Sequence, residues 1–266
     1  MLALTARPRE WLFTVTISIH ACRRRTLSVC RAAAGALLLA AGACAPTAHA
    51  EDGYDLWLRY RPLSGESAQA YRASTTWLIA PNATPTQIAA RSELVGALTG
   101  LLGNAPPTGD ALDGDGALVV GTAASSALIA KLKLDTAKMG REGYLIRSVV
   151  IDGHAATVIA GNDDIGTLYG VFHFLRLLQT SQSLQHLDLR ESPHLKLRLL
   201  DHWDDLDGHI ERGYAGASIW DWHKLPDWLD PRYTDYARAN ASLGINGSVL
   251  NNVRANALSL TPLYLE

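Results

Sequence analysis

The sequence predicts an α/β protein in two parts, a small sheet domain with helices packed on it and then a single βαβ unit. Strand-like runs alternate with amphipathic helical stretches up to about residue 180. Beyond a polar connection, residues 181–193, the order becomes strand, helix, strand over residues 196–250. A helix that joins two neighbouring strands of one sheet requires those strands to be parallel.

The sheet domain is expected to begin with two strands, Tyr54–Tyr60 and Thr75–Ala80, which are rich in aromatic and β-branched residues. A helix is predicted over Pro85–Leu102, because Thr84 and Gln87 form a capping box and proline suits the first helical position. Its apolar face is expected to contain Ile88, Val95, Leu98 and Leu102.

A buried strand over Ala117–Val120 and a short helix near residues 124–133 follow. Next, Gly143–Ile151 and Thr157–Ala160 predict a hairpin that turns at Asp152-Gly153, a pair typical of two-residue turns.

The last helix of the sheet domain is expected to begin after Asn162 as its N-cap. Its apolar stripe consists of Ile165, Leu168, Phe172, Leu175 and Leu178. Such a stripe is typical of core packing, and no catalytic constellation is found in this part of the chain.

The second part has a strand over Lys196–Asp201, a helix from Asp230-Pro231 to Leu243 and a strand over Ile245–Leu250. The loop after the first strand holds four of the seven tryptophans, Trp203, Trp220, Trp222 and Trp228, and carboxylates cluster beside the first of them. Burying such carboxylates unpaired costs several kcal/mol each, so indoles mixed with acids favour a wet, concave site. Sugars suit that surface, because their apolar ring faces stack on indoles and their hydroxyls bond to carboxylates and amides.

This region resembles the opening of the catalytic barrel in the family 67 α-glucuronidases of the glycoside hydrolases. The resemblance rests on the segments His202–Gly208, Ile210–Gly216, Ser218–Trp220, Leu243–Gly247 and Asn251–Val253, with Gly166–Arg176 resembling the end of the family's N-terminal domain. It extends over roughly residues 52–266 and is specific, since several long words occur in the right order.

After a leader over residues 1–50, the resemblance implies an α/β domain of the hexosaminidase domain-2 type over 51–190 and the start of an incomplete (β/α)8 TIM barrel over 191–266. It also implies inverting hydrolysis of the α-1,2 bond of glucuronic acid or its 4-O-methyl form on xylo-oligosaccharides, in xylan degradation. The family's catalytic carboxylates lie on later barrel strands, and this chain stops at Glu266. We therefore expect no catalytic residue in the chain and an inactive fragment.

Substrate-binding roles are expected for Trp203, Asp204, Asn252 and Val253. By the resemblance, Trp203 lines the uronic-acid pocket and Val253 lies near O4 of that sugar. Asn252 and its neighbour Asn251 bind hydroxyls or cap the backbone, and both possibilities stay open.

Asp204, Asp205 and Asp207 lie too close along one loop for an inverting pair, which stands about 6.5–9.5 Å apart, so loop-ordering bonds are favoured over catalysis. A zinc site at the three histidines of this loop is disfavoured, because their spacing lacks the helical i, i+4 form and no cysteine assists.

Two other functions stay open: a different glycoside hydrolase with the same N-terminal domain, such as a hexosaminidase, and a non-enzymatic carbohydrate-binding fragment. The His202–Asp205 run favours the glucuronidase over the hexosaminidase. The missing carboxylates favour a binding fragment, whereas an incomplete barrel argues against it.

The N-terminal residues predict a secretory leader. Arg23–Arg25 are followed by the apolar run Ala32–Ala43 and by Ala48–Ala50, which favours cleavage before Glu51 and a periplasmic or extracellular protein. Lipidation of Cys44, which would attach the protein to a membrane, is the alternative. All three cysteines lie in the leader, so the mature chain has no disulfide.

The leader holds six arginines and one acid, which leaves 18 basic and 25 acidic residues and a formal net charge of −7 in the remainder. This charge argues against nucleic acid as a partner. The expected partner is a glucuronoxylo-oligosaccharide substrate, and no cofactor or metal is expected.

Overall fold

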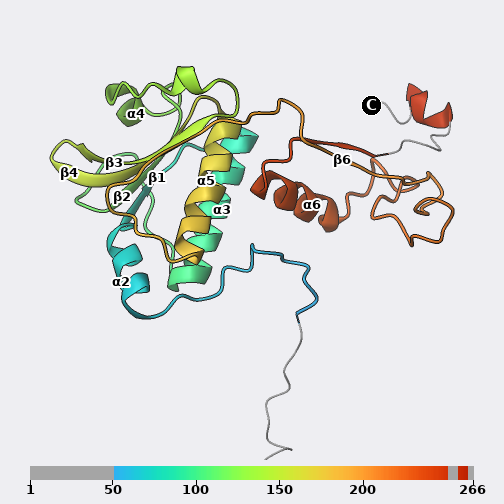
Figure 1. Cartoon of the computed structure of the whole chain (residues 1–266), viewed down its shortest axis with the longest axis horizontal. Helices are drawn as coiled ribbons and strands as arrows, with labels where there is room; N and C mark the ends of the chain where they lie inside the picture. The colour runs from blue at the N-terminus through green and yellow to red at the C-terminus, as the bar shows by residue number, and fades with distance from the viewer. Residues whose placement is uncertain (1–50, 251–256, 263–266) are drawn as a thin grey trace, which may run out of the picture. The chain divides into compact units, whose positions relative to one another are not determined.

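The computed structural model describes residues 51–250 and 257–262 (Figure 1). The predicted leader and two predicted site residues, Asn252 and Val253, lie outside the described residues. Residues from Asp55 onwards form one compact unit. In the described part of the chain, every helix is too short or too polar to cross a bilayer.

A five-stranded mixed sheet forms the centre of the sheet domain, in the order β1-β2-β4-β3-β5. β1 (Trp77–Ile79), β2 (Ala117–Gly121) and β4 (His154–Gly161) run parallel to one another. β3 (Tyr144–Ile151) pairs antiparallel with β4 on one side and with β5 (Asp188–Glu191) on the other. The predicted α/β class is therefore confirmed.

The hairpin of β3 and β4 turns where the sequence predicts. Asp152 and Gly153 have φ angles of 50° and 89°, and Ile151 pairs with His154 on either side of them. A type I′ turn requires positive φ at both central residues. β4 begins at His154 rather than Thr157, because its pairing with β3 continues up to the turn.

Different helices cover the two faces of the sheet (Figure 1). α3 (Pro85–Leu102) and α5 (Asp164–Gln179) pack on one face over the larger core, and α4 (Ala127–Lys131) covers the other face through Ile129. Alternate residues of a strand point to opposite faces, so β2 contributes to both cores and is buried throughout.

Both predicted ends of α3 are confirmed. The Thr84 hydroxyl accepts a hydrogen bond from the Gln87 backbone N–H at 3.2 Å, and the Gln87 side chain accepts one from the Thr84 N–H at 3.4 Å. The helix ends at Gly103, whose φ of 89° lies in the left-handed region that glycine adopts without strain.

The prediction that Ile88 and Ile165 are core residues is wrong. Ile88 is 50% exposed, because the buried face of α3 contains Leu94 and Leu101 on the far side of the helix. Ile165 is 37% exposed in the first turn of α5. A Cβ added at Gly170 would lie 2.7 Å from the Ile159 side chain, so α5 packs closely on the sheet where it has this glycine.

The predicted N-cap of α5 is also wrong by one residue. Asp163 is the cap, and its carboxylate accepts a hydrogen bond from the Gly166 N–H at 2.7 Å. Asn162 instead donates through its side chain to the Gly140 carbonyl at 2.9 Å.

The predicted strand over residues 54–60 is a series of turns. Leu58 donates to the Asp55 carbonyl at 2.9 Å, and Tyr60 packs so close to α3 that a Cβ at Gly100 would lie 2.7 Å from the Tyr60 carbonyl oxygen. Trp57 packs against Phe172 on α5 and Tyr60 packs on α3, so these aromatic residues pack on helices rather than pairing with a strand.

A helix and an edge strand of the sheet domain were not predicted, and neither was the 3₁₀ turn η1 (Thr136–Met139). α2 (Gly65–Ala73) has a weakly apolar sequence with two buried residues. β5 lies inside the polar connection, residues 181–193, and three of its four residues are exposed. The sequence does not indicate β5, because the side chains of this edge strand are mostly polar and solvated, so the alternation of apolar residues that marks a strand is missing.

The predicted βαβ unit is present. β6 (Leu199–Asp201) and β7 (Gly247–Val249) run parallel, with Leu199 opposite Gly247, and α6 (Pro231–Ser242) joins them. Both strands are shorter than predicted. A 3₁₀ turn, η2 (Ala257–Leu260), lies near the end of the described chain.

Polar contacts join α6 to the sheet domain. Arg238 pairs with Glu93 on α3 at 2.8 Å. The Arg176 guanidinium donates to the Ser242 carbonyl at 2.9 Å and lies 5.0 Å from the centroid of the Trp57 ring. The indole N–H of Trp57 donates to the Ser242 hydroxyl at 3.1 Å. A cation at the last residue of a helix also compensates the negative end of its dipole.

Candidate functional site

The candidate site is the loop that follows β6, between Asp201 and α6. Because β6 and β7 are parallel, their carboxyl ends meet at one edge of the two-stranded sheet. Trp203 lies two residues beyond the end of β6 and is 48% exposed. Asn252 and Val253 follow β7 in the sequence but lie outside the described residues, so their predicted roles stay predictions.

The first half of this loop is a compact hairpin-like fold. Asp204 bridges to Ile210 and His209 bridges to Ala217. The Glu211 N–H donates to the Trp203 carbonyl at 2.8 Å, which fixes the backbone that carries the exposed indole. The loop therefore presents Trp203 on an ordered backbone.

Asp204 stabilises this fold from inside. It is 3% exposed, and its carboxylate accepts a hydrogen bond from the Ser218 hydroxyl. The Ser218 hydroxyl in turn accepts a hydrogen bond from the backbone N–H of Trp220 at 2.9 Å. His202 Nδ1 lies 3.8 Å from the same carboxylate. These contacts match the loop-ordering alternative, and contact between Asp204 and a sugar stays a prediction.

A chain of hydrogen bonds anchors the start of the loop to the helix and to the second strand. His202 Nε2 lies 2.5 Å from the Tyr236 hydroxyl on α6, which lies 2.7 Å from the Ser248 hydroxyl on β7. The His202 N–H donates to the Val249 carbonyl at 2.8 Å. The residue before Trp203 is thus held by two elements, α6 and β7.

The tryptophans of the loop divide into packed and exposed ones. Trp220 is 9% exposed and packs on Tyr233 with ring centroids 4.8 Å apart, and on Tyr236 edge to face at 5.3 Å. The expectation that indoles here line a wet surface is therefore wrong for Trp220, which forms an aromatic core. Trp228 is 53% exposed, like Trp203.

Four carboxyl groups of the described chain have clearly lowered pKa values. The backbone and side chain of His209 lower the pKa of Asp207, the Lys224 ammonium lowers that of Asp221, and the Arg232 guanidinium lowers that of Asp230. Glu142 is the fourth. The general acid of a glycosidase needs a raised pKa, so none of the four is suited to that role.

The histidines of the loop do not converge on one point in the described chain. His202 is bonded to Tyr236, and His209 Nδ1 lies 3.2 Å from Asp207. Among the described residues, no group of three histidine, cysteine or acidic side chains is arranged to hold a metal ion.

Glu142 fixes the opposite, amino end of the two strands. It lies just before β3 in the sheet domain, and its carboxylate accepts hydrogen bonds from the Arg198 guanidinium and from the Asn246 amide, the latter at 3.2 Å. Arg198 immediately precedes β6 and Asn246 immediately precedes β7. Their backbones also bond to each other, since the Asn246 N–H donates to the Arg198 carbonyl at 3.0 Å.

Burial acts to raise the pKa of Glu142, but the hydrogen bonds and the charge of Arg198 and the amide of Asn246 outweigh burial and lower the pKa overall. The carboxylate is therefore charged at neutral pH. The sequence carried no local signal for this role, because Glu142 is 56 residues from Arg198 in the chain.

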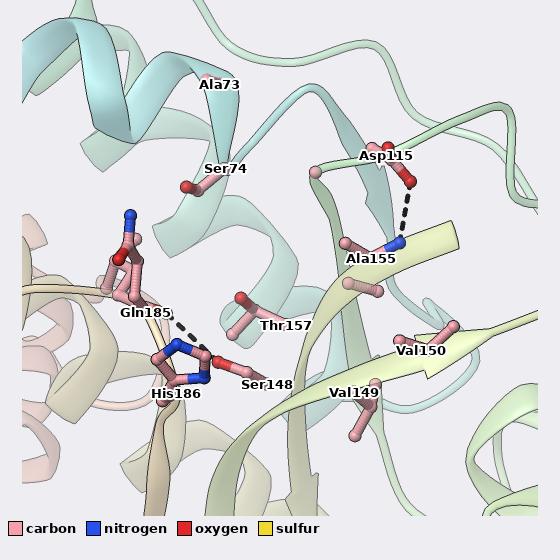
Figure 2. A pocket seen from close by; sticks show the side chains of 13 residues that line it. Ala73, Ser74, Asp115, Ser148, Val149, Val150, Ala155, Thr157, Gln185 and His186 are labelled. Atoms are coloured by element: carbon pink, nitrogen blue, oxygen red, sulfur yellow. Dashed lines mark hydrogen bonds between the residues drawn. The ribbon is translucent and has the colours of Figure 1, made fainter. Parts of the chain in front are cut away.

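A cavity of about 520 Å³ lies at the other end of the sheet domain, beside α2 and the turn end of β3 and β4 (Figure 2). Two of its polar side chains already have partners within the protein. The Ser148 hydroxyl accepts from the Leu187 N–H at 2.9 Å. It also lies 3.2 Å from the Leu184 carbonyl, and Asp115 accepts from the Ala155 N–H at 2.8 Å (Figure 2). Ser148 and Asp115 are therefore committed to contacts within the protein.

Two family models match the chain in order. The model of the glycosyl hydrolase family 67 N-terminus matches residues 56–174, and that of the family 67 middle domain matches residues 177–266. The first match contains the sheet as far as β4 and most of α5, and the second contains β5 and the βαβ unit with the candidate site.

Several similar proteins carry the name probable alpha-glucuronidase A. The chain is 34% identical over 223 residues to probable alpha-glucuronidase A of Aspergillus oryzae, which covers 82% of this chain and 26% of that protein. It is 31% identical over 217 residues to probable alpha-glucuronidase A of Aspergillus niger, with 80% and 25% covered. The chain thus spans about a quarter of the length of these relatives.

Among solved structures, the chain is similar to a family GH115 4-O-methyl-alpha-glucuronidase with specificity for decorated arabinogalactans, with a TM-score of 0.45, 20% identity and coverage of 66% of this chain and 25% of that one. The sequence matches carry the assignment. Because both successive domain models belong to one family and together match most of the chain, this chain belongs to glycosyl hydrolase family 67.

Proposed function

We propose that the chain provides the sheet domain and the first βαβ unit of the catalytic TIM barrel of an α-glucuronidase. The whole enzyme would hydrolyse the α-1,2 bond of glucuronic acid or its 4-O-methyl form on xylo-oligosaccharides, with inversion. The family matches and the relatives' names support this proposal. The structural observation that carries it is the parallel pair of β6 and β7, which brings an exposed indole to the edge where β/α barrels have their sites.

In this proposal Trp203 forms a wall of the sugar pocket. Its neighbours His202 and Asp204 are held by α6 and by Ser218, so the indole stands on a fixed backbone without itself being buried. A rigid, half-exposed aromatic ring loses little entropy when a sugar stacks on it.

We also propose that this chain binds the oligosaccharide substrate without cleaving it. The acidic groups that the structure describes near Trp203 include a buried, hydrogen-bonded Asp204 and two carboxyl groups of lowered pKa, Asp207 and Asp221. A lowered pKa makes Asp207 and Asp221 poor proton donors to a leaving oxygen at neutral pH, and the Asp204 carboxylate already accepts the Ser218 hydroxyl.

The test combines binding with turnover. The purified chain is titrated with glucuronoxylo-oligosaccharides, and free uronic acid is then measured after long incubation. We expect binding without release. Trp203→Ala is expected to weaken binding about tenfold or more, since stacking of this kind contributes about 1–3 kcal/mol in comparable ring stacks.

Trp228→Ala is the matched control, because this indole is exposed to a similar degree in the same loop. Equal loss of binding in both variants would contradict the assigned role of Trp203. Release of uronic acid at a rate comparable to an intact family member would place the acid and base on Asp204, Asp205, Asp207 or Glu211.

We propose that the protein is exported and cleaved before Glu51, which would place it in the periplasm or the medium. The Ala48–Ala50 sequence supports this position. The intact mass of the exported protein should correspond to a chain that starts at Glu51. A lipid on Cys44 would contradict cleavage there and attach the protein to a membrane.

A further inference from the structure

A second cavity of the sheet domain, of about 510 Å³, lies at the carboxyl ends of β1 and β2. The loop after β1 leads to α3 on one face of the sheet, and the loop after β2 leads to α4 on the opposite face. Neighbouring parallel strands whose following loops diverge leave a crevice between them. In α/β sheets, ligands bind in such crevices, so the topology alone marks this position.

The lining of this cavity is rich in polar side chains and comes from residues 79–82, 108–110 and 125–128, together with Arg91 on α3 and Val120 on β2. The side chains that can form hydrogen bonds to a ligand are Asn82, Arg91, Thr108, Asp110, Ser125 and Ser126. One glycine, Gly109, lines the cavity, and a Cβ at this position would lie 2.6 Å from the Trp77 ring.

Arg91 is the positive group of the cavity, and it is held in place. Its guanidinium donates to the Thr108 hydroxyl at 3.0 Å and to the Ala80 carbonyl at 3.4 Å. These two bonds use two of the five N–H donors of a guanidinium, so a ligand oxygen can be bound without breaking either. A guanidinium positioned in advance binds a carboxylate with little loss of side-chain entropy.

The two charges that line the cavity are not equally effective. Arg91 is half-buried, whereas Asp110 is exposed. Water and salt screen an exposed charge more strongly than a partly buried one, so the cavity favours an anionic group near Arg91. Asp110 and the amide and hydroxyl side chains then remain as partners for uncharged hydroxyl groups.

We propose that this cavity binds a small polyhydroxylated acid, of the sugar-acid class, with its carboxylate on Arg91. The site is built from β1, β2, α3 and α4 and shares no residue with the Trp203 loop. It therefore stands independently of the proposed function. Its ligand is held by hydrogen bonds and charge, because the lining contains no aromatic ring.

The experiment titrates the full chain with glucuronate and separately with glucose, and follows binding by calorimetry and by ligand-observed NMR. We expect glucuronate to bind at least about tenfold more tightly than glucose, which corresponds to one charge-assisted hydrogen bond. Glucose binding equal to that of glucuronate would overturn the proposal, because Arg91 would then contribute no charge recognition.

Two variants localise the site, and two further variants serve as controls. Arg91→Met should weaken glucuronate binding at least about tenfold, and Asn82→Ala, an exposed position that should not disturb folding, about fivefold. Arg147→Met is the matched control, because Arg147 lies on β3, does not line this cavity and pairs with Asp188 on β5 at 2.7 Å. Trp203→Ala separates the two sites. Binding that survives Arg91→Met and Asn82→Ala but is lost in Trp203→Ala would place the sugar acid in the loop after β6 and overturn the proposal.

Discussion

The two sheets of this molecule hold their strands by different forces. All five residues of β2 are buried between α4 and the pair α3 and α5, whereas all three residues of β6 are exposed. The sheet domain is stabilised by apolar packing. The βαβ unit is joined to it by ion pairs and hydrogen bonds from Glu93, Glu142 and Arg176. The loop that carries the candidate site therefore rests on contacts that respond to pH and to salt.

Phe174→Ala tests the apolar half of this comparison and should have the largest effect. Phe174 is fully buried in α5 against the sheet, and truncating such a ring typically costs about 3–5 kcal/mol. Urea unfolding of wild type and variant measures the loss. A change below about 1 kcal/mol would show that the core around α5 is not the main source of stability.

Glu142→Gln tests the polar half and should rank second. The Glu142 and Arg198 side chains are 10% and 19% exposed, and breaking a fully buried pair costs about 3–5 kcal/mol. With residual exposure and a neutral isostere we expect about 2–3 kcal/mol. Hydrogen exchange should show faster exchange of amides in β6 and β7 with little change in β2. Uniform acceleration in both sheets would contradict a local clamp.

The same residue predicts a pH dependence. The pKa of Glu142 is lowered from its ordinary value of 4.5, so its contribution is fully present above about pH 4.5 and is lost as the pH falls through the lowered folded-state pKa. Protection of β6 and β7 against exchange should fall in that acid range in the wild type. In Glu142→Gln this part of the acid dependence should be absent, whereas an identical pH profile would assign it to another group.

The ends of α3 and the hairpin turn could be predicted because their causes are local. Thr84 and Gln87 lie three residues apart, and Asp152-Gly153 determines its own turn. α5 shows the limit of this reasoning. Its contact with the sheet depends on Gly170, which an apolar pattern does not mark, so Ile165 was wrongly placed in the core.

The candidate site likewise has a part that the sequence predicts and a part that it does not. The order strand, helix, strand predicted that Trp203 follows a parallel strand, and the structure places it there, exposed. The burial of Trp220 could not be predicted, because its partners Tyr233 and Tyr236 lie on the following helix. The Glu142 clamp joins residues 56 and 104 positions apart in the chain, a distance over which composition and spacing carry no signal.

Thr84→Ala should have a smaller effect within the sheet domain. The Thr84 hydroxyl caps α3 and also donates to Asp164 at 2.7 Å, which ties α3 to α5. Loss of an N-cap typically costs about 1 kcal/mol. Thr84→Ser keeps the hydroxyl and is the matched control. Equal destabilisation of both variants in urea unfolding would assign the effect to the methyl group rather than to the cap.

Leu200→Lys should have the smallest effect on stability and is the sharpest test of the exposed sheet. Leu199, Leu200 and Val249 are 48%, 38% and 37% exposed in a two-stranded sheet. A charge on an exposed position usually changes stability by less than about 0.5 kcal/mol.

Exposed apolar strands promote association, and lysine on such a strand opposes it. Light scattering against protein concentration should therefore show less self-association than wild type, while the urea midpoint hardly moves. Destabilisation comparable to that of Phe174→Ala would mean that β6 is packed in solution, and the contrast between the two sheets would no longer hold.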